Sequence, residues 1–100
     1  MRKVGKVLPL TENVSFHALL QRENRVQIPV EVRWKYKLEP SEILRVKFLP
    51  LDRNLPFASA GEFHARLHKN GRITIPWELV ARLNLKPGIL LAVTLVKGRS

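Results

Sequence analysis

Hydrophobic and polar residues alternate over a stretch in the second half of the chain. From Phe63 to His68 every second residue is apolar, and the residues between are histidine or arginine, which is the pattern of a half-buried strand. After Lys69-Asn70-Gly71 the alternation resumes over 72–75 and stops at Pro76, which cannot donate to a strand ladder. The pattern predicts two strands joined by a tight turn.

Strand parity sets the length of this turn. If Leu67 and Ile73 both face the core, His68 lies opposite Arg72 and three residues remain in the loop. A three-residue hairpin loop needs left-handed backbone at its last position, where Gly71 stands. The sequence therefore predicts a positive φ at Gly71.

The same pattern occurs earlier in the chain, 47 residues before. Residues 16–49 align with 63–96 without a gap, and 12 of the 34 pairs are identical. Asn24 takes the place of Gly71, and asparagine is the non-glycine residue that best tolerates left-handed backbone. Two copies are too few for a solenoid. We therefore expect one domain built from two related halves, residues 1–50 and 51–100.

A short helix is expected after each pair of strands. Residues 77–85 place Pro76, Val80 and Leu83 on one helical face, with Glu78 just inside the start. The equivalent residues 30–38 alternate as a strand would. Because the two copies should fold alike, we predict a helix in both.

A turn and a third strand complete each half. Lys86-Pro87-Gly88 is typical of a turn, and strands are predicted at Ile43–Leu49 and Leu90–Val96. Residues 50–61 form a connector, and Val4–Leu8 is a candidate for an extra edge strand. The outer face of the last strand (Leu90, Ala92, Thr94 and Val96) is apolar where the first copy has Arg45 and Lys47. This difference predicts burial of that face, for example by self-association.

Composition narrows the function. The chain has 100 residues, 18 Lys+Arg, 8 Asp+Glu, a formal charge of +10 and no cysteine, and each half carries +5. An excess of positive charge attracts polyanions. No catalytic triad, phosphate loop or carboxylate pair is evident, so we expect no enzyme and no cofactor. No apolar run is long enough for a membrane span or a signal peptide, which favours a cytoplasmic protein.

The histidines do not suggest a metal site. His64 and His68 on one strand would lie about 13 Å apart, too far for chelation. His17 and His64 could approach each other across a pseudo-two-fold axis, an arrangement that we give little weight. We predict no metal.

The residues Gly71-Arg72-Ile73-Thr74-Ile75-Pro76-Trp77-Glu78-Leu79, with the strand before them and the turn Leu85-Lys86-Pro87-Gly88 after them, resemble the AbrB/SpoVT swapped-hairpin domain. The first copy resembles it too, with Asn24 replacing the usual glycine. The likeness covers about 90 residues as two units in tandem. It implies a mainly β fold with short helices, in which two copies exchange hairpins to form one interlocked β-barrel. The family includes DNA-binding transition-state regulators and antitoxins.

DNA binding is the function that we predict. By parity Arg66 and Arg72 share a solvent face with His64 and His68, and the resemblance implicates arginines of the hairpin turn and the helix start. The candidate DNA-binding residues are Arg22, Arg25, Arg33, Lys35, Arg66, Lys69, Arg72 and Arg82. Their partner would be duplex DNA in the nucleoid, contacted mainly through phosphates and shape.

The sequence leaves several alternatives open. The arginines could be ordinary solvated surface, and Arg25 and Arg72 could instead pair with Glu31 and Glu78. Family members often carry an arginine pair where this chain has Val80-Ala81, so the two halves need not contact DNA equally. The chain could also be a protein-interaction module, such as an antitoxin-like partner of a toxin. Trp34, Tyr36 and Trp77 could stack on bases, but packing in the core or anchoring of a helix is favoured.

Overall fold

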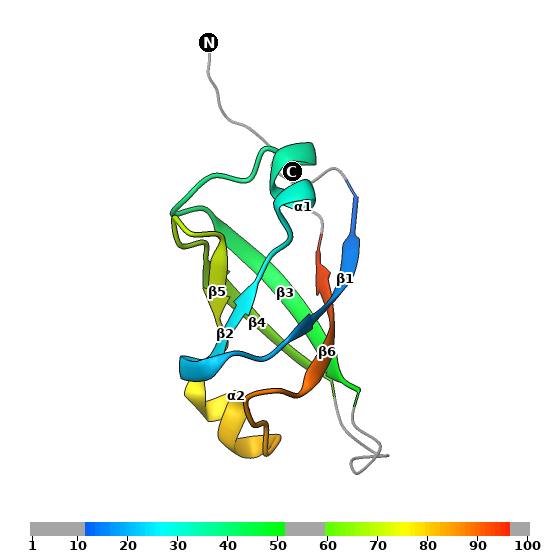
Figure 1. The fold of residues 1–100 in the computed structure, drawn as a ribbon, viewed down its shortest axis with the longest axis vertical. Coiled ribbons are helices and arrows are strands. Elements are labelled where there is room, and N and C mark those ends of the chain that lie inside the picture. The colour runs from blue at the N-terminus through cyan, green and yellow to red at the C-terminus, as the bar shows by residue number, and fades with distance from the viewer. Residues whose placement is uncertain (1–11, 52–59, 97–100) are drawn as a thin grey trace.

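The computed structural model describes residues 12–51 and 60–96 of the chain. The described elements run in two similar series (Figure 1). They are β1 (Val14–Leu19), the 3-10 turn η1 (Arg22–Asn24), β2 (Arg25–Gln27), α1 (Val30–Lys35), β3 (Ile43–Pro50), β4 (Gly61–Arg66), β5 (Arg72–Thr74), α2 (Trp77–Arg82) and β6 (Leu90–Leu95). The domain is mainly β with few short helices, as predicted, and no described helix is long and apolar enough to cross a membrane.

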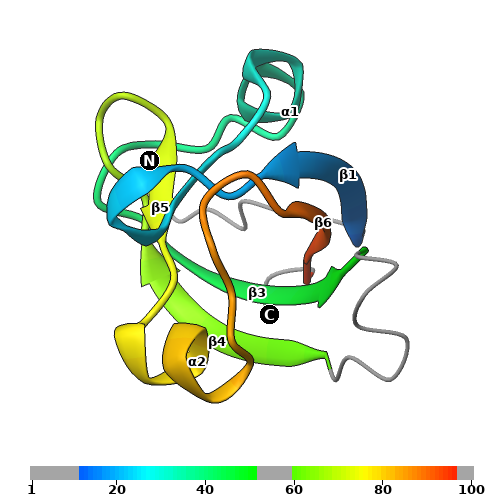
Figure 2. The ribbon, with the colours of Figure 1, turned by 60° about the horizontal axis from the view of Figure 1, so that its bottom comes forward.

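The strands form two antiparallel sheets. One sheet has the order β1-β6-β3-β4, and the other is a two-stranded ribbon of β2 and β5. Val26 lies opposite Ile73 and Lys47 opposite Thr94. Each of these pairs joins residues 47 apart, so an approximate two-fold axis passes through both sheets and relates the two repeats. The two helices lie at opposite ends of the molecule (Figures 1 and 2).

Two topological expectations are corrected by this arrangement. The strands form two separate sheets and do not close into a barrel. The strands that flank each turn also do not pair along their length, because β1 pairs with β6 and β2 with β5. The alternation of apolar and polar residues identifies the buried face of a strand but not the strand with which it pairs. In every ladder between the described strands, a strand of one repeat pairs with a strand of the other.

The core lies between the two sheets and follows the predicted parity. Leu44, Val46 and Phe48 of β3 are buried, as are the equivalent residues of β6. The Phe48 and Phe63 rings meet edge to face, with centroids 5.8 Å apart. The alternating exposure of β3 and β4 confirms the strand pattern.

The turns also match their predicted geometry. The His68 N–H donates to the Arg72 carbonyl at 2.9 Å and encloses three loop residues. Gly71 has a φ of +83° and Asn24 a φ of +62°. The turns after the helices show the same difference between the repeats, with a φ of +96° at Gly88 and +73° at Ser41. In each case a glycine of the second copy corresponds to a side-chain-bearing residue of the first.

Both predicted helices are present, and each starts directly after a proline. The connector lies mostly outside the described residues, and the candidate edge strand at Val4–Leu8 lies wholly outside them. On the outer face of β6, Leu90 is exposed, whereas Ala92, Thr94 and Val96 are half-buried. Self-association through that strand stays a prediction.

Candidate nucleic-acid interface

The ribbon of β2 and β5 places two arginines on its outer face. Val26 and Ile73, the central pair, are buried at 1% and 0% exposure. Side chains of neighbouring residues in a strand point to opposite faces, so Arg25 and Arg72 point away from the core. In the register Arg25 lies opposite Thr74, and Gln27 lies opposite Arg72.

Gln27 fixes the Arg72 end of this face. The Arg72 Nε donates to Gln27 Oε1 at 3.2 Å. The amide nitrogen of Gln27 donates to the backbone carbonyls of Asn70 and Gly71, at 3.2 and 3.3 Å. The Asn70 side chain in turn accepts from the Arg72 N–H at 3.2 Å. Arg72 is therefore positioned by contacts from both repeats.

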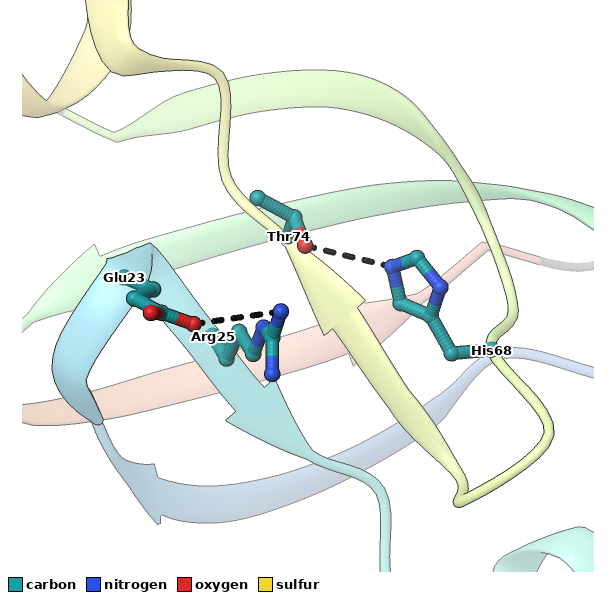
Figure 3. A network of polar contacts seen from close by, with 4 residues as sticks. All are labelled: Glu23, Arg25, His68 and Thr74. Atoms are coloured by element: carbon teal, nitrogen blue, oxygen red, sulfur yellow. Dashed lines mark hydrogen bonds and ion pairs between the residues drawn. The ribbon is translucent and has the colours of Figure 1, made fainter.

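Arg25 lies at the other end of the ribbon, between an acid and an imidazole. Its guanidinium pairs with Glu23 at 3.1 Å, and the His68 Nε2 lies 3.3 Å from the Thr74 hydroxyl (Figure 3). Arg25, His68, Lys69 and Asn70 line a shallow hollow beside the ribbon. Two of these four side chains, Arg25 and Lys69, are cationic, so the hollow is suited to an anion.

The two turns differ in charge. Glu23 in the first turn corresponds to Asn70 in the second, 47 residues later. Over the ribbon and its two turns, 21–27 and 68–74, Glu23 is the only acidic residue. The first turn therefore carries an internal counter-charge that the second lacks.

Arg33 has a different surrounding from the one predicted. Its guanidinium packs on the second turn so closely that a Cβ built on Gly71 would overlap Cζ and lie 2.6 Å from Nε. The Arg33 Nε is buried without a hydrogen-bond partner among the described residues. Arg33 therefore lies against the turn instead of extending freely toward a ligand.

The other candidates are spread over the surface. Arg22 and Lys69 are exposed in the two turns at the ribbon, whereas Lys35 and Arg82 lie on helices at opposite ends of the molecule. The Lys35 Nζ lies over the Tyr36 ring, 5.4 Å from its centroid. Arg66 belongs to the other sheet and donates to the Ser41 carbonyl at 3.1 Å. The structure thus gathers Arg22, Arg25, Lys69 and Arg72 around the ribbon and separates the rest.

The two helix glutamates do not hold the ribbon arginines. Glu31 and Glu78 are exposed at the starts of α1 and α2. Arg25 pairs with Glu23 instead, and Arg72 bonds Gln27. The alternative pairing is therefore wrong in both repeats.

Three acidic groups away from the ribbon have shifted pKa values. On the outer face of the larger sheet, the hydrogen bond from Arg45 lowers the pKa of the Glu62 carboxyl. Partial burial raises the pKa of Glu42 beside the Ser41 turn. The hydrogen bond to the Glu12 carboxylate raises the pKa of the Tyr36 hydroxyl.

The approach of His17 to His64, which the sequence left open with little weight, does not occur. His17 and His64 lie on β1 and β4, which are the two edges of the four-stranded sheet. Two strands separate them, a gap of about 14 Å. Among the described residues, no group of three potential ligands could hold a metal ion.

The sequence reasoning missed two features. Gln27 was overlooked because its contact with Arg72 depends on the pairing of β2 with β5 of the other repeat. Its place opposite Arg72 does follow once Val26 is paired with the equivalent residue, Ile73. The tryptophans were expected to pack in the core or to anchor their helices, but Trp34 is 76% exposed and Trp77 69% exposed. Both project from the outer faces of their helices, so the core prediction is wrong for them. Tyr36 is partly buried against the core, as favoured.

No protein-family model matches the chain, and no curated protein matches it. Among solved structures, the chain is similar to the solution structure of PHS018 from Pyrococcus horikoshii, with a TM-score of 0.74 and 26% sequence identity. The similarity covers 95% of this chain and 100% of that one. This likeness extends over both repeats, so the whole two-repeat architecture, and not one half of it, is shared with that protein.

Proposed function

We propose that the protein binds duplex DNA through the β2–β5 ribbon and its two turns. The observation that carries the proposal is the gathering of half-buried Arg25 and Arg72 on the outer face of the ribbon, beside exposed Lys69 and with a single carboxylate among them. A two-stranded ribbon is narrow enough to approach a DNA groove. The net charge of +10 would steer the whole domain toward a polyanion.

The contacts would be mainly to phosphates. Gln27 and Asn70 are the polar side chains best placed to contact base edges, but both are engaged in hydrogen bonds within the protein. The arginines and Lys69 remain for the backbone of the duplex. We therefore expect modest sequence preference, based on DNA shape.

We extend the proposal to the family and the role. The pairing of each repeat's strands with those of the other supports membership among AbrB/SpoVT-type swapped-hairpin proteins, with both copies in one chain. A transcription regulator associated with the nucleoid in the cytoplasm fits this proposal.

A titration of a short fluorescent duplex tests it. Affinity should fall steeply between about 50 and 200 mM salt, because each phosphate contact releases counterions. Arg25→Ala and Arg72→Ala should each weaken binding and reduce the slope of log K against log salt by about 0.9. Lys47→Ala removes the same charge from the outer face of the larger sheet and serves as the control. Binding that is absent at low salt, or equally reduced by all three substitutions, would contradict the proposal.

The inequality of the turns provides a sharper test. Glu23→Gln removes the counter-charge beside Arg25, and Asn70→Asp places one at the equivalent position of the second turn. We expect tighter binding for the first variant and weaker binding for the second. If Asn70→Asp left affinity unchanged while Arg25→Ala reduced it, the second turn would not be part of the contact.

A further inference from the structure

The exposed faces of the two helices share one pattern. Each carries two apolar residues four positions apart: Val30 and Trp34 on α1, and Trp77 and Ala81 on α2. Residues at this spacing lie side by side on a helix. Val30 is 39% exposed and the two tryptophans far more. Each stripe therefore combines one large ring with one smaller residue, in opposite order on the two helices.

A charged pair flanks each stripe on the same side. Glu31 and Lys35 accompany the stripe of α1, and Glu78 and Arg82 occupy the equivalent positions on α2. All four are exposed. In the described part of the chain, the four side chains form no ion pair with one another. Each helix thus presents an apolar stripe beside one negative and one positive charge.

This pattern is self-complementary. When two identical helices pack antiparallel, the first residue of the stripe on one faces the second residue on the other. For α1, Trp34 would then pack on Val30 of a second copy, and Val30 on its Trp34. The flanking charges reverse in the same way, so Glu31 meets Lys35 of the second copy. On α2 the same arrangement places Trp77 on Ala81, and Glu78 near Arg82.

We propose that a second copy of this chain docks on each tryptophan stripe, α1 against α1 and α2 against α2. Contacts between like surfaces are the usual form of two-fold association. A pairing of α1 with α2 is less complementary, because it would bring the two tryptophans together and leave the two smaller residues facing each other. Since the helices lie at opposite ends of the molecule (Figure 1), docking at both ends links copies into a row.

The contact is small. Two six-residue helices with one tryptophan each cover less than the roughly 1,200 Å² of a stable interface. The chain also carries +10, so two copies repel each other at low salt. Association should therefore be weak in dilute solution and should strengthen as salt is added. This salt dependence is opposite to that of duplex binding, so the two proposals can fail independently.

Analytical ultracentrifugation of the full chain tests the docking, from about 10 µM to about 1 mM protein at low and high salt. We expect the parent to form species larger than a dimer at high concentration. Trp34→Ala and Trp77→Ala should each stop at a dimer, because one stripe remains intact. The double variant should associate at least about tenfold more weakly than either single variant. Both tryptophans are exposed, so the variants should keep the parent's circular dichroism spectrum and melting temperature.

Charge reversal provides a second readout at the α1 end. In the Trp77→Ala background, Glu31→Lys should weaken the remaining dimer, and adding Lys35→Glu should restore it by returning opposite charges to the contact. A parent that stays monomeric at the highest concentration, or a double tryptophan variant that associates like the parent, would overturn the proposal. So would single variants that are monomeric alone but dimerise when mixed, because this result requires α1 to dock on α2.

Discussion

Substitution of Gly71 by alanine tests how the second turn is built from both repeats. The backbone at Gly71 has a φ of +83°, which costs a residue with a Cβ about 1–2 kcal/mol. The new methyl group would also overlap the Arg33 guanidinium, which arrives from α1 of the other repeat. This group is the end of a flexible side chain, so its displacement should add no more than about 1 kcal/mol. We expect the free energy of unfolding to fall by about 1–3 kcal/mol.

A double-mutant cycle separates the two costs. Gly71→Ala is measured by equilibrium urea unfolding in the parent and in an Arg33→Ala background, where the overlap is absent but the positive φ remains. The loss should be smaller by about 0.5–1 kcal/mol in that background. A thermal melt should show the parent-background loss as a fall of about 4–8 °C for each kcal/mol. An equal loss in both backgrounds would refute the contact with Arg33, and no loss in either would refute the backbone argument.

Three further predictions concern the turns, the core and the larger sheet. Ser41 has a φ of +73° at the position where the second repeat has Gly88. Ser41→Gly should therefore stabilise the fold by about 1 kcal/mol, and Gly88→Ser should destabilise it by a similar amount. Chemical denaturation of both variants checks this. Ile73→Ala removes a fully buried side chain at the two-fold axis and should cost about 2–5 kcal/mol by the same measurement, whereas Ile73→Val should cost about 0.5–1.5 kcal/mol. Arg45 lowers the pKa of Glu62 in the folded protein, so their interaction stabilises the fold above the unfolded pKa of Glu62 and is lost as the pH falls through the lowered value. In Arg45→Met, an NMR titration should show the pKa of Glu62 moving up toward 4.5. An unmoved pKa would refute the assignment.

The local structure was largely predictable from the sequence. The left-handed residues Gly71 and Asn24 followed from the parity of the strands around them, because a three-residue loop leaves little choice of backbone. The helix at α1 followed from its clearer copy at α2. These features depend on near neighbours in the chain, which a sequence shows directly.

Features that depend on distant pairing were not predictable in the same way. The partner of β1 could not be read from alternation, because any strand with a matching buried face would satisfy it. The place of Arg33 against Gly71 depends on contact between the repeats. Trp34 was misplaced because a ring on a six-residue helix can face the core or solvent after a small rotation, and only the packing of Val32 and Tyr36 decides which. The sequence predicted basic residues at the ribbon. It did not predict which of the candidates lie together there and which lie elsewhere on the molecule.

The exchange of strands between the repeats has a consequence for how the protein is made. Since every ladder between the described strands joins the first half of the chain to the second, residues emerging early from the ribosome have no strand partner until the late ones appear. Such long-range pairing slows folding relative to a chain of the same length with local contacts. The first half can therefore form its sheets only after the second half has been synthesised. Either half expressed alone should lack a stable fold.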